Sequence, residues 1–427
     1  MRIAVVGAGV SGLLVAHLLH EAHDVVVFEA SNHAGGHANT VRVDTPNETH
    51  HVDTGFVVFN DRNYPGFERL LARLSIGWQR STMSFSVSDG AGDFEYSSAS
   101  ALGLYAKPAH LLSPRFQRMV ADLVRFNRAA RELLSQERED PSLGEWLERQ
   151  RFSRAFIERL IVPQVAAVWS ADPSQRWSFP ARFLVQFFAN HGMLSFFGRP
   201  RWRTIPGGSV RYVRALVEPL GERLRLRTPV DSVERHDDHV LVRARGRQDE
   251  RFDELVLATH SDQALTLLAD AGAGEREILG AIPYQRNEAA LHTDVRMLPR
   301  RRRAWASWNY HLRPPSQGAS ADGESGVPES GVAITYHMNR LQSLRAEREF
   351  CVTLNRTEAI DPQKIIRTIP YAHPVFTREG VAAQARVAEI SGANRTHFCG
   401  AYWGWGFHED GVVSGLRVGR EFGAPPL

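Results

Sequence analysis

The first 36 residues constrain the fold more than any other part of the sequence. A short apolar strand is predicted at Ile3–Val6, followed by a glycine-rich turn at Gly7–Gly12, an apolar helix to about Ala22 and a second strand at Val25–Phe28. This order is typical of the βαβ unit that binds a dinucleotide. It predicts an α/β, Rossmann-like domain with its ligand at the start of the helix.

The three glycines of this unit answer separate physical needs. Gly7 permits the tight turn, Gly9 lets a pyrophosphate approach the backbone, and Gly12 lets the helix lie close to the sheet. Free N–H groups at the helix start face the phosphates, and Glu29, at the end of the second strand, is placed to accept hydrogen bonds from ribose hydroxyls. The predicted cofactor contacts in this unit are Gly7, Gly9, Val10, Ser11, Gly12, Glu29 and Ala30.

A second glycine pair distinguishes this chain from a nicotinamide-dependent dehydrogenase. Gly35 and Gly36 follow the predicted second strand, and a hairpin-like stretch then leads to Thr54-Gly55-Phe56. On these residues the chain resembles the flavin-containing amine oxidase superfamily, which includes protoporphyrinogen oxidase and phytoene desaturase. The resemblance implies FAD as cofactor, a glutathione-reductase-like FAD-binding domain of the amine-oxidase type, and cofactor contacts from Gly35, Gly36, His37, Thr54, Gly55 and Phe56.

Two central segments extend the resemblance. Trp202–Gly208 is similar to the Pro-x-Gly-Gly turn of the superfamily, and Phe252–Thr259 is similar to the strand that returns under the cofactor. The resemblance places Val230 at the adenine side and adds Ala258 and Thr259 to the implied contacts.

The C-terminal segment supplies a third implied contact. A strand is expected within Thr396–Tyr402, ending near Gly400, and a helix is expected to begin within His408–Gly415 with Asp410 as its N-cap. In the superfamily this helix points its N-terminus at the flavin, where its partial positive charge would stabilise a reduced anionic flavin. Gly400, Asp410, Gly411 and Val412 are the implied contacts, and the alternative is a helix that only packs on the sheet.

One residue departs from the pattern of the superfamily. The position after the glycine pair is commonly arginine, whereas this chain has His37. His37 either donates a hydrogen bond to phosphate or flavin, with a protonation state that depends on pH, or is an exposed loop histidine.

Length and composition set the outline of the rest. The 427 residues suffice for two domains. We predict an FAD-binding domain from residues 1–75, 203–265 and 390–427, and a discontinuous α+β substrate domain from residues 76–202 and 266–389. Helices are expected from the apolar periodicity of Phe116–Leu134 and Leu143–Ile161.

Cellular context follows from what the sequence lacks. No apolar run approaches the roughly 20 residues of a membrane-spanning helix, and Met1-Arg2 leads directly into the first predicted strand, so we expect a cytoplasmic protein without a signal peptide. Cys351 and Cys399 are the two cysteines, which excludes a disulfide framework or a cysteine-based metal site. We predict no metal, and no nucleic-acid partner because no recognition motif accompanies the arginines.

A stretch rich in aromatic residues and arginine near the end of the first insert has two interpretations. Trp177, Phe183, Phe187 and Trp202 belong to it, with arginines such as Arg176 interleaved. It forms either a hydrophobic tunnel with a membrane-facing mouth or the core of a helical domain. Leu102–Leu112 is a second candidate for docking on a membrane surface.

Further strings in the second half resemble one bacterial branch of the superfamily. They include the sequences beginning at Ala290, Trp305, Tyr336, His373 and Gly404. Members of that branch are associated with the synthesis of cyclopropane and methylated, including furan, fatty acids. The resemblance implies a long apolar substrate, most simply a phospholipid acyl chain, with possible partners in a lipid methyltransferase and the inner face of the cytoplasmic membrane.

Desaturation of such a chain would transfer a hydride to flavin N5 and a proton to a base. The candidate bases are His408, Glu409, His292 and His373, since histidine titrates near neutrality and burial raises the pKa of carboxylates. Each of them has a structural alternative, as a core histidine or as a loop residue that bonds to the backbone.

Three other functions stay open at this stage. A flavin amine oxidase would need an aromatic cage, which Tyr402, Trp403, Trp405 and Trp308 would supply. The chain has lysine only at Lys107 and Lys364, which weakens this interpretation because many amine oxidases use a lysine near the flavin. The other two are a redox-neutral fatty-acid hydratase or isomerase, and a non-catalytic lipid-binding partner.

Overall fold

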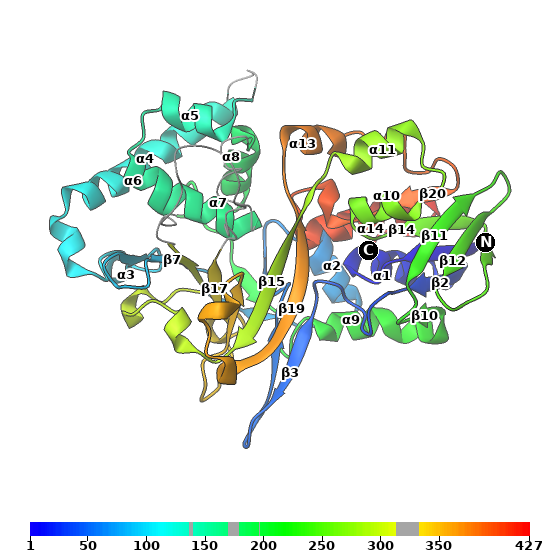
Figure 1. Ribbon diagram of the computed structural model, residues 1–427, viewed down its shortest axis with the longest axis horizontal. Helices are drawn as coiled ribbons and strands as arrows, with labels where there is room; N and C mark the ends of the chain where they lie inside the picture. Colours follow the sequence, from blue (N-terminus) through cyan, green and yellow to red (C-terminus); the bar gives the residue numbers. More distant parts are fainter. Residues whose placement is uncertain (136–139, 170–178, 196, 313–332) are drawn as a thin grey trace. The chain divides into compact units, whose positions relative to one another are not determined.

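The computed structural model describes residues 1–135, 140–169, 179–195, 197–312 and 333–427, and the chain forms two compact units (Figure 1). Unit 1 contains Met1–Gln79, Arg203–Tyr284 and Pro374–Leu427, and unit 2 contains Arg80–Trp202 and Gln285–His373. The predicted boundaries at residues 265 and 390 differ from this division, because residues 266–284 and 374–389 cluster with unit 1. Helices α11 (Ala273–Gly280) and α13 (Arg378–Gln384) contribute Ile278, Leu279 and Ala383 to a core of unit 1, which explains the difference.

A five-stranded parallel sheet is the centre of unit 1. Its order is β10-β2-β1-β14-β20, and its strands are β10 (Leu224–Arg225), β2 (Asp24–Phe28), β1 (Arg2–Val6), β14 (Glu254–Leu257) and β20 (Thr396–Phe398). The central strands are apolar on both faces because both faces are covered. One core contains residues of α1 (Val10–Leu19), α2 (Pro65–Arg73), α9 (Val210–Val217) and α14 (His408–Glu421). The other contains residues of α10 (Ser261–Leu267), α11 and the antiparallel strands β11 (Val230–Arg235), β12 (Val240–Ala244) and β13 (Glu250–Phe252).

Helices α1 and α14 lie against each other in unit 1 (Figure 1). A Cβ atom on Gly411 would lie 2.7 Å from Val10 Cγ1, and one on Gly415 would lie 2.9 Å from the Ser11 carbonyl oxygen. A Cβ atom on Gly419 would likewise lie 2.9 Å from Leu18 Cδ1. One face of α14 is therefore built from small residues at four-residue spacing, which lets the two backbones approach. Helix α1 ends at Leu19, three residues earlier than the sequence predicted.

A seven-stranded mixed sheet is the centre of unit 2. Its order is β19-β15-β18-β17-β16-β7-β8, and its strands are β19 (Ile365–Pro374), β15 (Tyr284–His292), β18 (Cys351–Leu354), β17 (Ile334–His337), β16 (Trp308–His311), β7 (Phe85–Ser88) and β8 (Glu95–Ser97). Side chains alternate between the faces of each strand, so the register assigns every residue to one face.

The two faces of this sheet differ sharply in polarity. Where β8, β7, β16, β17, β18 and the end of β15 are paired, one face carries aliphatic and aromatic side chains, from Tyr96, Phe85, Val87, Trp308, Tyr310, Ile334, Tyr336, Val352, Leu354, Ala289 and Leu291. Further along β15, Gln285 and Asn287 add polar side chains to the same face. The opposite face carries mainly polar residues, including Glu95, Ser86, Asn309, Thr335, Thr353 and His292, all of which are at most 1% exposed. We call the first the apolar sheet face and the second the polar sheet face.

Helices form the second layer of unit 2 (Figure 1). They are α4 (Pro114–Ser135), α5 (Leu143–Arg149), α6 (Arg154–Phe156), α7 (Val162–Trp169) and α8 (Ala181–Asn190), with shorter helical turns at α3 (Ala101–Leu104) and η1 (Pro108–Leu112). The segment Leu143–Ile161 is largely helical, as predicted, but Arg151 adopts a positive φ of 53° and ends α5 before α6 begins. None of the described helices has the length and apolar character needed to cross a bilayer.

The aromatic stretch of unit 2 packs largely as a core where it is described. Phe179, Phe187 and Phe188 are at most 4% exposed, and Phe187 packs on Trp169 with ring centroids 4.8 Å apart. Arg176, Trp177 and Phe196 lie outside the described residues.

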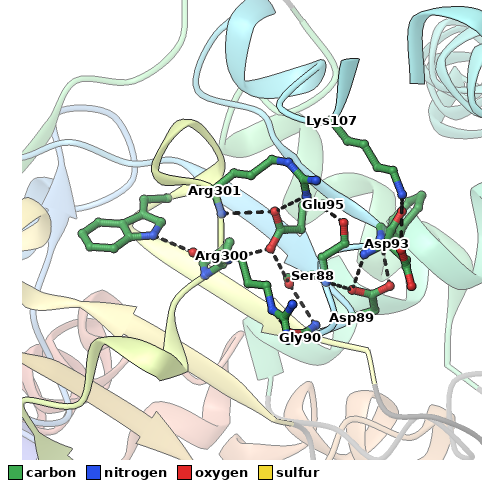
Figure 2. A network of polar contacts seen from close by, with 12 residues as sticks. Ser88, Asp89, Gly90, Asp93, Glu95, Lys107, Arg300 and Arg301 are labelled. Carbon is green, nitrogen blue, oxygen red and sulfur yellow. Dashed lines mark hydrogen bonds and ion pairs between the residues drawn. The ribbon is translucent and has the colours of Figure 1, made fainter. Parts of the chain in front are cut away.

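A buried carboxylate fixes the β7–β8 hairpin to a following segment of unit 2 (Figure 2). Glu95 is fully buried and accepts hydrogen bonds from the Arg300 N–H (2.6 Å), the Arg301 N–H (3.2 Å) and Arg301 Nη1 (3.0 Å). In the turn of the hairpin, Asp89 accepts N–H groups from Gly92 and Phe94. The hairpin is therefore held in one conformation at both its strand and its turn.

Candidate cofactor site

The glycine-rich turn has the geometry that a bound pyrophosphate requires. Gly7 has a φ of +105°, and a Cβ atom there would lie 2.7 Å from the Ala258 carbonyl oxygen. A Cβ atom on Gly12 would lie 2.1 Å from the Gly7 carbonyl oxygen, whereas one on Gly9 would have no atom within 4 Å. Gly7 and Gly12 thus serve close backbone packing, and Gly9 borders open space. No side chain caps the start of α1, so the first N–H groups of the helix, at Val10 and Ser11, point toward that space without an intrahelical partner.

The second glycine pair lies directly against the first turn. Gly35 forms an isolated parallel bridge with Gly9, and its N–H donates to the Ala8 carbonyl oxygen at 2.8 Å. A Cβ atom on Gly36 would lie 3.3 Å from the Gly9 Cα atom. The two glycine motifs, separated by a helix and a strand in the sequence, therefore form one backbone-lined cradle.

Glu29 links this cradle to the adenine side of the predicted site. Its carboxylate accepts the Ala8 N–H (2.8 Å), the Ser31 N–H (2.8 Å) and the Ser31 hydroxyl (2.8 Å). A carboxylate has about four acceptor positions, so capacity for a ribose hydroxyl is left. The Thr228 N–H donates to the Glu29 carbonyl oxygen, which brings the segment leading to Val230 beside Glu29, next to the exposed Ala30.

His37 lies at the other side of the cradle. It is half-buried rather than an exposed loop residue, and its ring lies 6.2 Å from that of His260. His260 follows Ala258 and Thr259 at the end of β14 and stacks on Tyr284, and burial lowers its pKa. His260 is not among the contacts predicted from the sequence, although it directly follows two of them, Ala258 and Thr259.

The segment Thr54-Gly55-Phe56 connects the cradle with the start of α14. Thr54 donates its N–H (2.9 Å) and its hydroxyl (3.0 Å) to the Asn39 carbonyl oxygen, and the Phe56 N–H donates to the His37 carbonyl oxygen. The Phe56 ring stacks on the His408 ring with centroids 3.7 Å apart. The predicted contacts of the second glycine motif and of the C-terminal helix are therefore brought together.

The prediction of Asp410 as the N-cap of α14 is wrong. The helix begins at His408, and Asp410 is its third residue, whose carboxylate accepts the Phe407 N–H at 2.8 Å. The Gly411 N–H is bonded to the Phe407 carbonyl oxygen, and the Val412 side chain is fully buried beside Gly66. Gly400 precedes α14 and donates its N–H to the Ser414 hydroxyl. Burial raises the pKa of Asp410 to about 7.

Glu409 binds the start of another helix. Its two carboxylate oxygens accept the Gly66 N–H (2.7 Å) and the Phe67 N–H (2.8 Å), which are orphan donors at the beginning of α2. Burial raises its pKa. These contacts give Glu409 a structural task, because acting as a base would require the carboxylate to leave both donors.

His408 is enclosed by aromatic side chains. Its Nε2 atom lies 2.6 Å from the Tyr212 hydroxyl, and the Phe67 ring meets it edge to face. Burial lowers the pKa of His408 to about 3. The ring is neutral at physiological pH and poorly suited to accept a proton.

The other two candidate bases belong to the unit 2 sheet. His292 is fully buried on the polar sheet face, where Nε2 lies 2.7 Å from the Thr353 hydroxyl and Nδ1 accepts the Asp294 N–H. Burial lowers its pKa to about 4. His373, at the end of β19, is half-buried and lies 2.8 Å from the Asn287 side-chain amide. The structure thus does not bring the four candidates together within one unit.

An adjoining network in unit 1 leads to a prediction about pH. The carboxylate of Asp53, at the end of β4 (Thr49–Asp53), is buried and accepts the hydroxyls of Thr40 (2.5 Å) and Ser209 (2.8 Å) and the Ser209 N–H (2.9 Å). Burial raises the pKa of Asp53 from 3.8 to about 6. The pKa of Asp53 is therefore higher in the folded protein than in the unfolded one. Protonated Asp53 contributes stability to the fold, and this contribution is complete below pH 3.8 and is lost as the pH rises through 6.

We therefore expect Asp53→Asn to remove a pH dependence of about 3 kcal/mol in the free energy of unfolding. Urea titrations of both proteins at acidic and neutral pH measure it. The wild type should lose stability relative to the variant as pH rises. Parallel curves would show that Asp53 is not the titrating group.

The residues of the cradle fit an FAD. Gly9 borders open space at the start of an uncapped helix, Glu29 keeps an acceptor position, and the backbones of Gly35 and Gly36 close the turn. These residues would hold the pyrophosphate and the adenosine ribose. In the described part of the chain no group of three or more His, Cys, Asp and Glu side chains is arranged to hold a metal ion.

Comparisons with known proteins agree with this geometry. Residues 10–288 match the family model of flavin-containing amine oxidoreductases. The fold is similar to cyclohexylamine oxidase from Brevibacterium oxydans IH-35A, with 15% identity, 98% of each chain covered and a TM-score of 0.69. It is similar to putrescine oxidase bound to putrescine, with 15% identity, full coverage of both chains and a TM-score of 0.67. It is also similar to a fatty acid isomerase from P. acnes that produces CLA, with 15% identity, 99% of this chain and 98% of that chain covered, and a TM-score of 0.68.

The superfamily, the fold class and the cofactor predicted from the sequence are thereby confirmed. The family match spans more than half of the chain, and it includes the start of α1 at Val10, the glycine pair Gly35-Gly36 and the strand that returns beside Gly7. The chain therefore belongs to the flavin-containing amine oxidoreductase family and is an FAD-dependent oxidoreductase.

Proposed function

We propose that this oxidoreductase acts on a long apolar substrate and desaturates a methyl-branched or unsaturated fatty-acyl chain of phospholipid. The observation that carries the proposal is the apolar sheet face of unit 2, on which the paired residues of β7, β16, β17, β18 and the end of β15 are all aliphatic or aromatic. An acyl chain gains free energy when it leaves water for such a surface.

Part of this face is less buried than the rest. Phe85, Trp308 and Tyr336 are direct neighbours across β7, β16 and β17 and are only half-buried, whereas Val352, the next residue across the sheet, is 2% exposed. Trp308 and Tyr336 meet edge to face with ring centroids 5.2 Å apart. This aromatic row is the part of the face that we assign to the substrate.

Desaturation removes a hydride from one carbon and a proton from its neighbour. When bound, FAD supplies the hydride acceptor at its N5 atom. Among the candidate bases, His292, His408 and Glu409 are buried and hydrogen-bonded within the protein. We therefore assign the proton-accepting role to the half-buried His373, which Asn287 orients. Removal of hydride from an unactivated saturated carbon is difficult for a flavin, so an existing double bond or another activating group in the substrate is needed beside the carbon that loses hydride.

Amine oxidation is the second candidate, because two of the similar structures are amine oxidases. The aromatic residues Tyr402 and Trp403 pack together in unit 1 with ring centroids 4.8 Å apart, as part of a cage would. Many amine oxidases use a lysine near the flavin, and the two lysines of this chain are engaged elsewhere. Lys107 is bonded to Asp93, and Lys364 lies beside Asp294 and Asp361. A third candidate is redox-neutral isomerisation or hydration of a fatty acid, and the observation behind it is the similarity to a fatty acid isomerase.

The test is mass spectrometry of membrane acyl chains from cells that express the protein beside a lipid methyltransferase, the proposed partner. The proposal expects loss of two hydrogens from methylated or unsaturated chains. Trp308→Asp, which places a charge in the aromatic row, should retain FAD and lose most of this product. Gly9→Trp should lose FAD and product together.

Other outcomes point to the alternatives. A shifted double bond at constant mass, or gain of water, would replace desaturation by redox-neutral chemistry. Unchanged acyl chains with FAD bound would contradict the lipid proposal, and anaerobic bleaching of the flavin by an amine would then establish the amine oxidase.

A further inference from the structure

The start of the helical layer in unit 2 exposes leucine side chains beside basic ones. Leu111 and Leu112, at the end of η1, are 56% and 89% exposed, and Leu102 in α3 is 71% exposed. Between residues 98 and 131 the chain has six basic side chains and a single acidic one, Asp122, which is buried. The basic residues are Lys107, Arg115, Arg118, Arg125, Arg128 and Arg131.

The exposed leucines are held on a rigid base. Beneath them His110 stacks on Phe116 with ring centroids 4.2 Å apart, and Phe94 packs against both rings. The side-chain amide of Gln117 donates to the carbonyl oxygens of His110 (3.0 Å) and Leu111 (3.1 Å). The backbone that presents Leu111 and Leu112 is thus fixed by packing and by hydrogen bonds.

The network around Glu95 extends this base. The Lys107 ammonium donates to the Asp93 carbonyl oxygen at 2.7 Å, at the turn of the hairpin that Glu95 and Asp89 hold (Figure 2). The segment between α3 and η1 is thereby tied to the sheet. Little conformational entropy is lost when such a preordered surface binds a partner.

We propose that Leu111 and Leu112, with Arg115 and Arg118 on the first turns of α4, form a docking surface for an anionic phospholipid bilayer. Charge complementarity selects this occupant. Asp122 is the acid that pairs with Arg118 (3.3 Å) and Arg125 (2.6 Å), and Arg115 has no carboxylate partner among the described residues. Exposed leucines insert at the headgroup boundary while arginines bind phosphate groups.

The inference goes beyond the proposed function, because binding to lipid is measured without turnover. The experiment is co-sedimentation of the holoprotein with vesicles of phosphatidylcholine alone or mixed with phosphatidylglycerol. We expect binding to the anionic vesicles that weakens with added salt. The double variant Leu111→Ser, Leu112→Ser should bind at least roughly tenfold more weakly, and Arg115→Glu should lose roughly tenfold or more on anionic vesicles.

The matched control is Val295→Ser, which changes another aliphatic side chain of unit 2 that is 42% exposed. It should leave vesicle binding unchanged, and flavin absorbance should show that every variant is folded. Equal binding by the leucine double variant and the wild type would overturn the inference. Dissociation of an oligomer by that variant, seen in sedimentation velocity, would overturn it in favour of self-association.

Discussion

Gly9→Trp is expected to give a folded protein that no longer retains FAD. A Cβ atom at Gly9 meets no atom within 4 Å, so the side chain can be accommodated, but it fills the space that the pyrophosphate needs beside the uncapped start of α1. The purified variant should lack the visible flavin absorbance while its far-ultraviolet circular dichroism stays close to that of the wild type.

Two glycines provide controls for this prediction. Gly77 also borders open space, outside the cradle, so Gly77→Trp should keep its FAD. Gly12→Val places a Cβ atom 2.1 Å from the Gly7 carbonyl oxygen and should fail to fold rather than fold without cofactor. Full flavin content in Gly9→Trp would show that the cofactor does not approach this turn.

Glu409→Ala is expected to reduce the free energy of unfolding by about 3 kcal/mol. The substitution leaves the Gly66 and Phe67 N–H groups buried without their acceptor, and hydrogen bonds to a charged group are worth about 1.5–3 kcal/mol each before the structure relaxes. Urea unfolding of the FAD-loaded protein measures the change.

Glu409→Gln separates the structural role of this residue from the catalytic one. The amide keeps one oxygen acceptor, so the variant should recover part of the stability. If Glu409 only positions α2, kcat per bound FAD should stay near the wild-type value with an unchanged pH profile. A loss of kcat without a loss of stability would instead identify Glu409 as the base.

The cofactor cradle is the part of the site that the sequence predicted best. Turns such as Gly7–Gly12 depend on residues that are neighbours along the chain, so glycine spacing and strand patterning carry the information. The resemblance to a known family implied that both glycine motifs serve the cofactor, and the contact between them is a finding of the structure.

At the start of α14 the prediction from residue types was wrong. Asp410 has the residue type of an N-cap, yet the helix begins at His408, with Asp410 bonded back to Phe407 as its third residue. Glu409 and His408 were plausible bases from residue type alone. Glu409 binds Gly66 and His408 binds Tyr212. Both partners lie far away in the sequence, so no local pattern predicts these contacts.

By itself the sequence determined the βαβ unit, the glycine cradle and the FAD-dependent family, because these rest on local conformation and on recognisable motifs. Only the tertiary structure decided which side chains are buried together. It placed residues 266–284 and 374–389 in unit 1, gave the unit 2 sheet one apolar and one polar face, and enclosed His292 and His408. The physical reason is that the burial of a side chain depends on which distant segments of the chain pack against that side chain. Burial in turn sets the pKa of a histidine and the role of a carboxylate.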